Sequence, residues 1–237
     1  LRKEERVMND FFSESLFAGV TISLIAYMAG IFLNKKYKLP IFNPLLISIV
    51  LSIAVLVVAD IDYEVYNAGA SYLSWFLTPA TVCLAIPLYE QLHVLKKNWK
   101  AIMLAITSGV LTSAVAIFVL AKIMKLSHKE YVTLLPKSIT TVIGMGLSEE
   151  MQGYVTITVA VIIITGVIGN MLGEGVCKIF RITHPVAKGL ALGTSAHVLG
   201  TAKAMEMGEV EGAMSSLSIV VAGVLTVAAS LVFANLI

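Results

Sequence analysis

The chain has 237 residues, of which 58% are hydrophobic and 14% charged, and its mean hydropathy is +0.89. Soluble domains carry about 25% charged residues, so this composition excludes an ordinary water-soluble domain. The net charge of +2 is small, and the basic residues are scattered between apolar stretches. This pattern argues against a nucleic-acid-binding protein.

Long apolar stretches follow one another along the chain. A membrane-spanning helix needs about 20 mostly apolar residues. We therefore predict an all-α, polytopic membrane protein whose single transmembrane domain covers residues 1–237. Two shorter stretches, 131–147 and 189–205, are interrupted by Lys137, His197 and Lys203. The stretches without Asp, Glu, Lys or Arg are 16–33, 39–59, 65–89, 101–121, 152–173 and 212–237.

Charged loops predict the topology, because Lys and Arg accumulate on the cytoplasmic side. The basic loops at 35–38, 96–100 and 178–188 are expected inside, and the acidic loops at 60–64 and 206–211 outside. The lysines between 122 and 129 disagree with this assignment. We also expect Lys203 and Glu206 to pair, and Glu209 and Glu211 to lie in a solvated loop. The first apolar stretch is expected to stay in the mature protein, because lysines follow it at once.

An internal repeat is suggested by the sequence of residues 109–112, which recurs at 223–226 after a shift of 114 residues. The same shift aligns Pro79 with Gly193 and Thr81 with Ser195. Chance identity is the alternative in a chain rich in Gly, Val and Leu. If 131–147 re-enters the membrane without crossing, residues 16–122 and 131–237 form inverted repeats, with about seven crossings and one re-entrant or broken segment.

Candidate breaks combine a helix-breaking residue with hydroxyl side chains at 78–81, 135–141 and 193–201. A break with unpaired backbone groups persists only inside protein or beside a water-filled cavity. Pro favours the first helical turn, where Ser or Thr caps exposed N–H groups. Each break is therefore expected to begin a half-helix, whose N-terminus attracts anions.

Two ionisable residues lie within these breaks. An ammonium at Lys137 between leucines and an isoleucine is costly in hydrocarbon unless it meets water, a counter-charge or an anionic substrate. The alternative is that Lys137 extends to the membrane interface or pairs with Glu149. His197 is interpreted either as a hydrogen-bonded packing residue or as a proton-coupling group.

Enzyme motifs are absent from the sequence, which contains no HExxH, Walker loop or Gly-x-Ser-x-Gly pattern. Cys83 and Cys177 are too few for a disulfide framework, and His and Cys ligands do not cluster. We therefore expect neither enzymatic activity nor a metal or cofactor.

Specific motifs resemble the LrgB/CidB family of bacterial membrane proteins, over nearly the whole chain from about residue 16. They are PATVCLAIPLY at 79–89, LPKSITT at 135–141, GLALGTSAH at 189–197 and GEVEGAMSS at 208–216. The chain departs from many relatives at Val142, where proline is common. The resemblance implies either antiholin-like control of murein hydrolases with an LrgA/CidA-type partner, or transport of pyruvate, glycolate or glycerate.

We accordingly expect a multi-pass protein of the bacterial cell membrane that transports small monocarboxylates by alternating access. The alternative is a membrane interaction protein that modulates autolysis with a holin-like partner. A homo-oligomer is also expected. Lys137 is assigned to the substrate carboxylate. The other predicted binding residues are Ser138, Thr140, Thr141, Pro79, Thr81, Gly193, Thr194, Ser195, His197 and Thr201.

Overall fold

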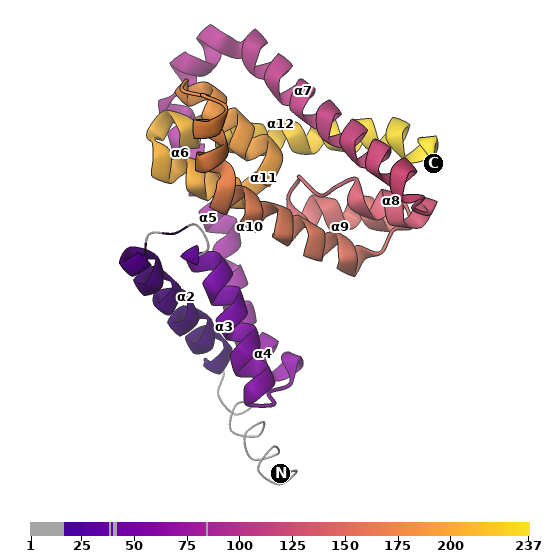
Figure 1. Cartoon of the computed structure of the whole chain (residues 1–237). Helices are drawn as coiled ribbons and strands as arrows, with labels where there is room; N and C mark the ends of the chain where they lie inside the picture. The colour runs from indigo at the N-terminus through magenta and orange to yellow at the C-terminus, as the bar shows by residue number, and fades with distance from the viewer. Residues whose placement is uncertain (1–16, 38, 40–41, 84) are drawn as a thin grey trace. The chain divides into compact units, whose positions relative to one another are not determined.

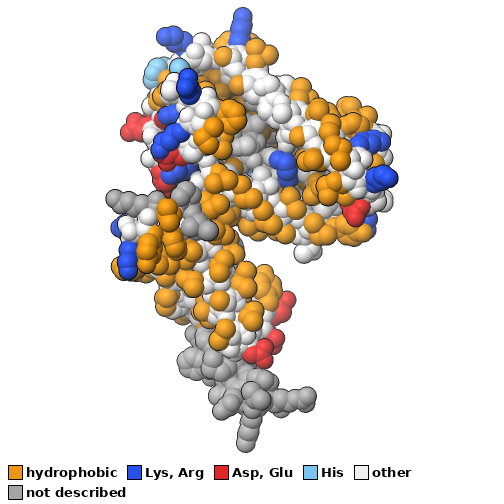
Figure 2. Space-filling view, in the orientation of Figure 1, with side chains coloured by type: hydrophobic (Ala, Val, Ile, Leu, Met, Phe, Trp, Pro, Cys, Tyr) orange, Lys and Arg blue, Asp and Glu red, His pale blue; other side chains and the backbone are white. Residues whose placement is uncertain are grey.

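A computed structural model of the chain describes residues 17–37, 39, 42–83 and 85–237. All regular secondary structure in these residues is helical (Figure 1), which confirms the predicted fold class. The described residues form two units, one ending at Cys83 and one beginning at Ala85. By length and composition, Ala18–Tyr37, Leu92–Met124, Val155–Ile179 and Glu209–Leu236 can cross a membrane. Hydrophobic side chains cover much of the visible face of each unit (Figure 2).

The first unit is held together by close approaches to helix α2 (Ala18–Tyr37). A Cβ added at Gly30 would lie 2.6 Å from the backbone carbonyl oxygen of Pro44, the first residue of α3 (Pro44–Val58). The hydroxyl of Ser23 is hydrogen-bonded to that of Tyr66 in α4 (Tyr63–Ala70) at 2.7 Å. Asn43 caps α3, because its side-chain oxygen accepts from the N–H of Leu45.

The stretch 65–89 is not one continuous helix. It is divided among α4, the 3₁₀ helix η2 (Ser71–Phe76), α5 (Leu77–Cys83) and α6 (Ala85–Glu90), which belongs to the second unit. Pro79 lies inside α5, after the 3₁₀ turn. Proline removes a backbone donor, so two prolines in this stretch disfavour a long regular helix. The predicted count of about seven crossings stays a prediction.

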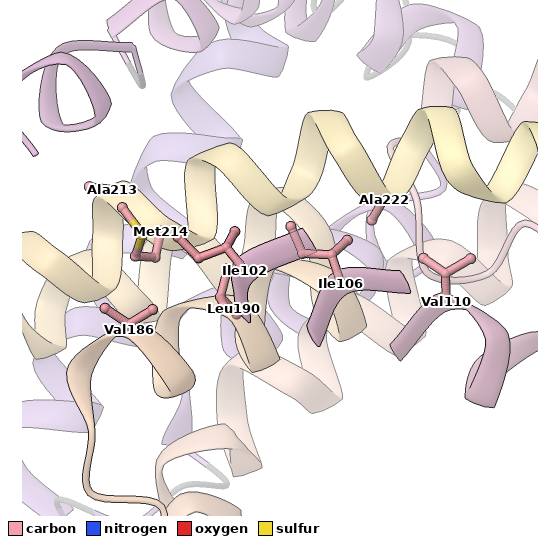
Figure 3. Packing of buried hydrophobic residues seen from close by; sticks show 8 residues of the cluster. All are labelled: Ile102, Ile106, Val110, Val186, Leu190, Ala213, Met214 and Ala222. Atoms are coloured by element: carbon pink, nitrogen blue, oxygen red, sulfur yellow. The ribbon is translucent and has the colours of Figure 1, made fainter. Parts of the chain in front are cut away.

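The second unit contains the long helices α7 (Leu92–Met124), α10 (Val155–Ile179) and α12 (Glu209–Phe233). On α7, apolar residues recur every three or four positions from Ile102 to Ala121 and are buried, as expected of a helix with one face in a core. Figure 3 shows how part of this face packs with α11 (Pro185–Met207) and α12. The buried residues of this core are Ile102, Ile106, Val110, Val186, Leu190, Ala213, Met214 and Ala222.

Residues 128–150 fold back on themselves as helical hairpin 1, made of α8 (His128–Leu134), the connection 135–140 and α9 (Thr141–Glu150). Near its base, the hydroxyl of Thr158 at the start of α10 donates to the Thr133 carbonyl of α8 at 2.9 Å and is hydrogen-bonded to the Ser148 hydroxyl of α9 at 2.7 Å. Both arms therefore begin at the same end of the unit. The non-helical connection agrees with the predicted break at 135–141, and re-entry of this segment into the membrane stays a prediction.

Hairpin 1 begins with a capping box. The Ser127 side chain accepts from the Glu130 N–H, and the Glu130 carboxylate accepts from the Ser127 N–H at 2.8 Å. Hydrogen bonds from Ser127 hold the pKa of the Glu130 carboxyl below its ordinary value. The Tyr131 hydroxyl then donates to the Phe233 carbonyl at 2.9 Å, so the base of hairpin 1 is attached to the end of α12.

Helix α11 also folds back, and its two halves form helical hairpin 2. The backbone leaves the helical region at Ala196 and His197, where φ of His197 is 44°. In the first half, Gly189 packs against Glu211 and Gly193 against Ser215, so this half runs parallel to α12. In the second half the direction reverses, because Thr201 bonds to Ser215 at 2.7 Å while the later Met205 lies against the earlier Gly212.

This reversal corrects the predicted topology. Lys203 and Glu206, near the end of α11, form an ion pair at 3.1 Å, as predicted, and Lys203 also contacts Glu174 at the end of α10 at 3.2 Å. The loops at 178–188 and 206–211 therefore lie at the same end of the unit, and their assignment to opposite sides is wrong. The solvated loop expected at 209–211 is also wrong, because both glutamates lie in the first turn of α12 and Glu211 is 7% exposed.

We define the proximal end of the second unit as the end at which α7 begins, α10 ends and hairpin 2 has its base. The distal end is where α7 ends, α10 begins and hairpin 1 has its base. Figure 1 shows the C-terminal ends of α7 and α12 near α8, at the distal end. The two hairpins thus enter the second unit from opposite ends, and their turns lie in its middle.

Candidate functional site

A cavity of about 710 Å³ lies in the second unit where the turns of the two hairpins approach α7. Helix α7 supplies one wall, hairpin 1 supplies Lys137 and Ser138, and the first half of α11 supplies most of the opposite wall. The polar lining residues are Asn98, Ser108, Thr112, Ser113, Lys137, Ser138, His184, Thr194 and Ser195.

Apart from Ile102, the α7 wall consists of small and polar side chains that recur every three or four residues from Asn98 to Ala116. This spacing places them on one face of the helix, beside the buried apolar face. A Cβ added at Gly109 would lie 2.8 Å from Cγ2 of Thr194. The absence of a side chain at Gly109 therefore lets α7 approach α11 closely at this depth.

Lys137 is half-buried in the non-helical turn of hairpin 1, and its Nζ donates to the Ser138 hydroxyl at 2.8 Å. Among the lining residues that the structure describes, none is Asp or Glu. No ion pair joins Lys137 to Glu149 among the described residues. The cavity thus presents a positive charge and several hydroxyl groups, which favours a small anion.

Thr194 also lines the cavity. The residue is 9% exposed, and its Oγ1 is buried without a hydrogen-bond partner within the described part of the chain. A buried hydroxyl without a partner costs about 1–3 kcal/mol, so such groups usually meet water or a ligand. Ser195 also lines the cavity, but its hydroxyl donates to the Ala191 carbonyl at 2.7 Å.

The other predicted residues of the second unit do not line the cavity. Thr140 and Thr141 begin α9, and Gly193 faces α12. Pro79 and Thr81 belong to α5 of the first unit, and the side chain of Thr81 is outside the described part of the structure.

His197 and Thr201 have packing roles in the structure. His197 is 4% exposed, and its Nε2 lies 3.0 Å from the Ile162 carbonyl oxygen of α10. Gly166 makes room for this ring, because an added Cβ there would lie 2.7 Å from it. Thr201 donates to the His197 carbonyl at 3.0 Å. The structure thus agrees with the packing interpretation of His197.

Asn170 supports the turn of hairpin 2, since its Nδ2 donates to the Leu199 carbonyl at 2.6 Å. We expect Asn170→Leu to lower the free energy of unfolding by about 1 kcal/mol, because it removes this hydrogen bond between α10 and the start of the second half of α11. Thermal unfolding in detergent measures the change, and Asn235→Leu, on an exposed side chain, is the control. An equal change in both variants would contradict the role of Asn170.

The α7 residues Asn98, Ser108, Thr112 and Ser113 were not predicted as cavity residues. In the sequence these residues form a stripe of small and polar side chains at helical spacing. The stripe lies within a hydrophobic stretch that is typical of a membrane span, so it was not recognised as a cavity wall. Thr112 also belongs to the repeated motif at 109–112.

Comparison with known proteins identifies the family. Residues 23–236 match the model of the LrgB-like family. The chain belongs to the LrgB-like family. Antiholin-like protein LrgB of Bacillus cereus strain B4264 is 44% identical over 210 residues, covering 88% of this chain and 91% of the relative. Antiholin-like protein LrgB of Bacillus anthracis strain CDC 684 matches with the same identity and coverage. No solved structure matches the chain significantly.

Family membership and the long apolar helices together make this LrgB-like chain a multi-pass protein of the cell membrane. Two of the four motifs that carry the resemblance described above lie at the two hairpins. The segment LPKSITT contains the turn of hairpin 1, and GLALGTSAH ends at the turn of hairpin 2. These motifs therefore supply Lys137, Ser138, Thr194 and Ser195 to the cavity.

Proposed function

We propose that the chain is an antiholin-like membrane protein that modulates murein hydrolase activity, acting with an LrgA/CidA-type membrane protein. The observation that carries this proposal is the 44% identity, over 88% of the chain, to proteins named antiholin-like protein LrgB. The match covers 91% of the relative, so both units are included. Formation of a homo-oligomer stays a prediction.

The antiholin-like function is testable in a Bacillus strain that lacks its own LrgB-like protein. We expect expression of the chain to slow detergent-induced autolysis and to lower murein hydrolase activity on zymograms. The control is expression of an unrelated multi-pass membrane protein at the same membrane level, which corrects for membrane load. Equal autolysis rates in the two strains would contradict the proposal. Co-purification with the strain's LrgA-type protein tests the partner separately.

A second candidate function is the transport of small monocarboxylates, such as pyruvate, glycolate or glycerate, by alternating access. The specific observation in its favour is that two hairpins from opposite ends meet at a cavity that contains Lys137 and no described carboxylate. Discontinuous helices that turn near the middle of the membrane are frequent substrate sites in secondary transporters. A carboxylate flux that changes the proton gradient would also alter hydrolase activity, so the two functions are compatible.

A further inference from the structure

A second, much smaller cavity lies against the main one. Its volume is about 10 Å³, which is about the space that one water molecule needs. Ser113, Ser138 and Thr194 line both cavities. The small cavity extends to Thr226 and Ser230 of α12, so hydroxyl groups continue beyond the floor of the main cavity. We call it the inner cavity.

The two cavities overlap along α7 but extend toward different ends of the unit. Lining residues of the main cavity include Asn98 and His184, near the starts of α7 and α11, so it reaches toward the proximal end. The inner cavity instead reaches Phe233, the last residue of α12, at the distal end. Thr194, whose buried Oγ1 has no described partner, lies at the boundary between them.

An apolar cluster closes the inner cavity at the distal end. Leu135 and Phe233 both line this cavity. Leu135 belongs to the apolar cluster that also contains Ile117, Ala121, Tyr131 and Val132, and Phe233 packs against that cluster. Leu135 lies in the turn of hairpin 1, and the Tyr131 hydroxyl bonds to the Phe233 carbonyl. Hairpin 1 thus carries both the Lys137 turn and part of the closure.

We propose that the inner cavity is the distal continuation of a solute path and that Leu135 and Phe233 form its gate. This proposal deepens the second candidate function and rests on it. In the structure the main cavity extends toward the proximal end, and Leu135 and Phe233 belong to or pack against the apolar cluster at the distal end. Movement of hairpin 1 would separate Leu135 from Phe233 and connect the hydroxyl groups of Ser113, Thr194 and Ser230 to the distal side.

Cysteine labelling tests this path without requiring transport. In a background with C83A and C177A, S230C places a thiol in the inner cavity, T112C places one in the main cavity, and A222C places one in the buried core. A charged, membrane-impermeant thiol reagent is then added separately to each side of the membrane. We expect T112C to react from one side, S230C to react from the opposite side, and A222C to stay unreactive.

The gate is tested by adding F233A to the S230C protein. The change removes the aromatic ring that packs at this end of the inner cavity, so we expect the labelling rate of S230C from the distal side to rise at least about tenfold. The same change should leave labelling of T112C unaltered, which shows that the protein remains folded. An unchanged S230C rate, or S230C labelling from the same side as T112C, would overturn the proposal.

Failure of the proposal and failure of carboxylate transport give different results. If the wild-type protein takes up no carboxylate in proteoliposomes but F233A accelerates S230C labelling, the path is supported and its assigned solute is wrong. If uptake is saturable but labelling is unaffected by F233A, the transported solute follows another route and the proposed gate is rejected.

Discussion

Replacing Lys137 by alanine is expected to reduce saturable uptake of labelled pyruvate or glycolate into proteoliposomes at least about tenfold. The expectation follows because a hydrogen bond to a charged group contributes about 1.5–3 kcal/mol, and each 1.4 kcal/mol is a factor of about ten. Lys137 Nζ reaches the cavity beside Ser138. A carboxylate at this place would receive a charge-assisted hydrogen bond.

Matched variants separate the charge of Lys137 from its geometry. Lys137→Arg keeps the charge but replaces a compact ammonium by a planar fork, so an intermediate uptake is expected. Lys178→Ala is the control, because Lys178 is an exposed lysine paired with Glu174 at 2.8 Å and does not line the main cavity. Equal saturable uptake by Lys137→Ala and the wild type would remove Lys137 from the mechanism.

Replacing Gly193 by leucine is expected to prevent stable packing of hairpin 2 against α12, and Gly193→Ala to destabilise the protein by about 1–3 kcal/mol. An added Cβ would collide with the Ser215 backbone carbonyl and with the hydroxyl oxygens of Ser215 and Ser218. Backbone atoms cannot rotate away, so the helices must separate. Thermal unfolding in detergent and the yield of monodisperse protein measure the effect.

Gly175→Ala is the matched control for Gly193→Ala. Gly175 is also a helical glycine, but an added Cβ there would meet no atom within 4 Å. Alanine favours the helix by about 0.5–1 kcal/mol over glycine, so this change should be neutral or stabilising. If Gly193→Ala is as stable as Gly175→Ala, the close contact between hairpin 2 and α12 is wrong.

The breaks could be predicted from the sequence because their causes are local. Pro136 and the following hydroxyl residues end one helix and start another, and the structure is non-helical at 135–140. The second break, predicted at 193–201, occurs at Ala196 and His197. The cavity residues Lys137, Ser138, Thr194 and Ser195 come from these two predicted breaks.

The direction of the chain after a break could not be predicted in the same way. Hairpin 2 turns back because His197 adopts a φ of 44°, which non-glycine residues seldom adopt and which neighbouring packing must stabilise. That packing comes from Ile162 and Gly166 of α10, about thirty residues away in the sequence. Hydrophobic patterns carry no information about such a contact, so the prediction assigns the loops at 178–188 and 206–211 to opposite sides.

The polar stripe on α7 was missed for a related reason. Ser108, Thr112 and Ser113 occur in a stretch hydrophobic enough to be a membrane span. Hydroxyl side chains can bond to carbonyl groups of their own helix, as Ser108 does to Ala105 at 2.8 Å, so they do not by themselves indicate a cavity. Only the approach of both hairpins to this face makes it part of a candidate site.

The central claim is that the cavity between α7 and the two hairpins is the functional site of this LrgB-like protein. The most direct test measures autolysis in the Bacillus strain described above, with Lys137→Ala and Lys178→Ala present at the same membrane level as the wild type. We predict that Lys178→Ala slows autolysis as the wild type does and that Lys137→Ala does not. Slowing by Lys137→Ala equal to that of the wild type would contradict the claim.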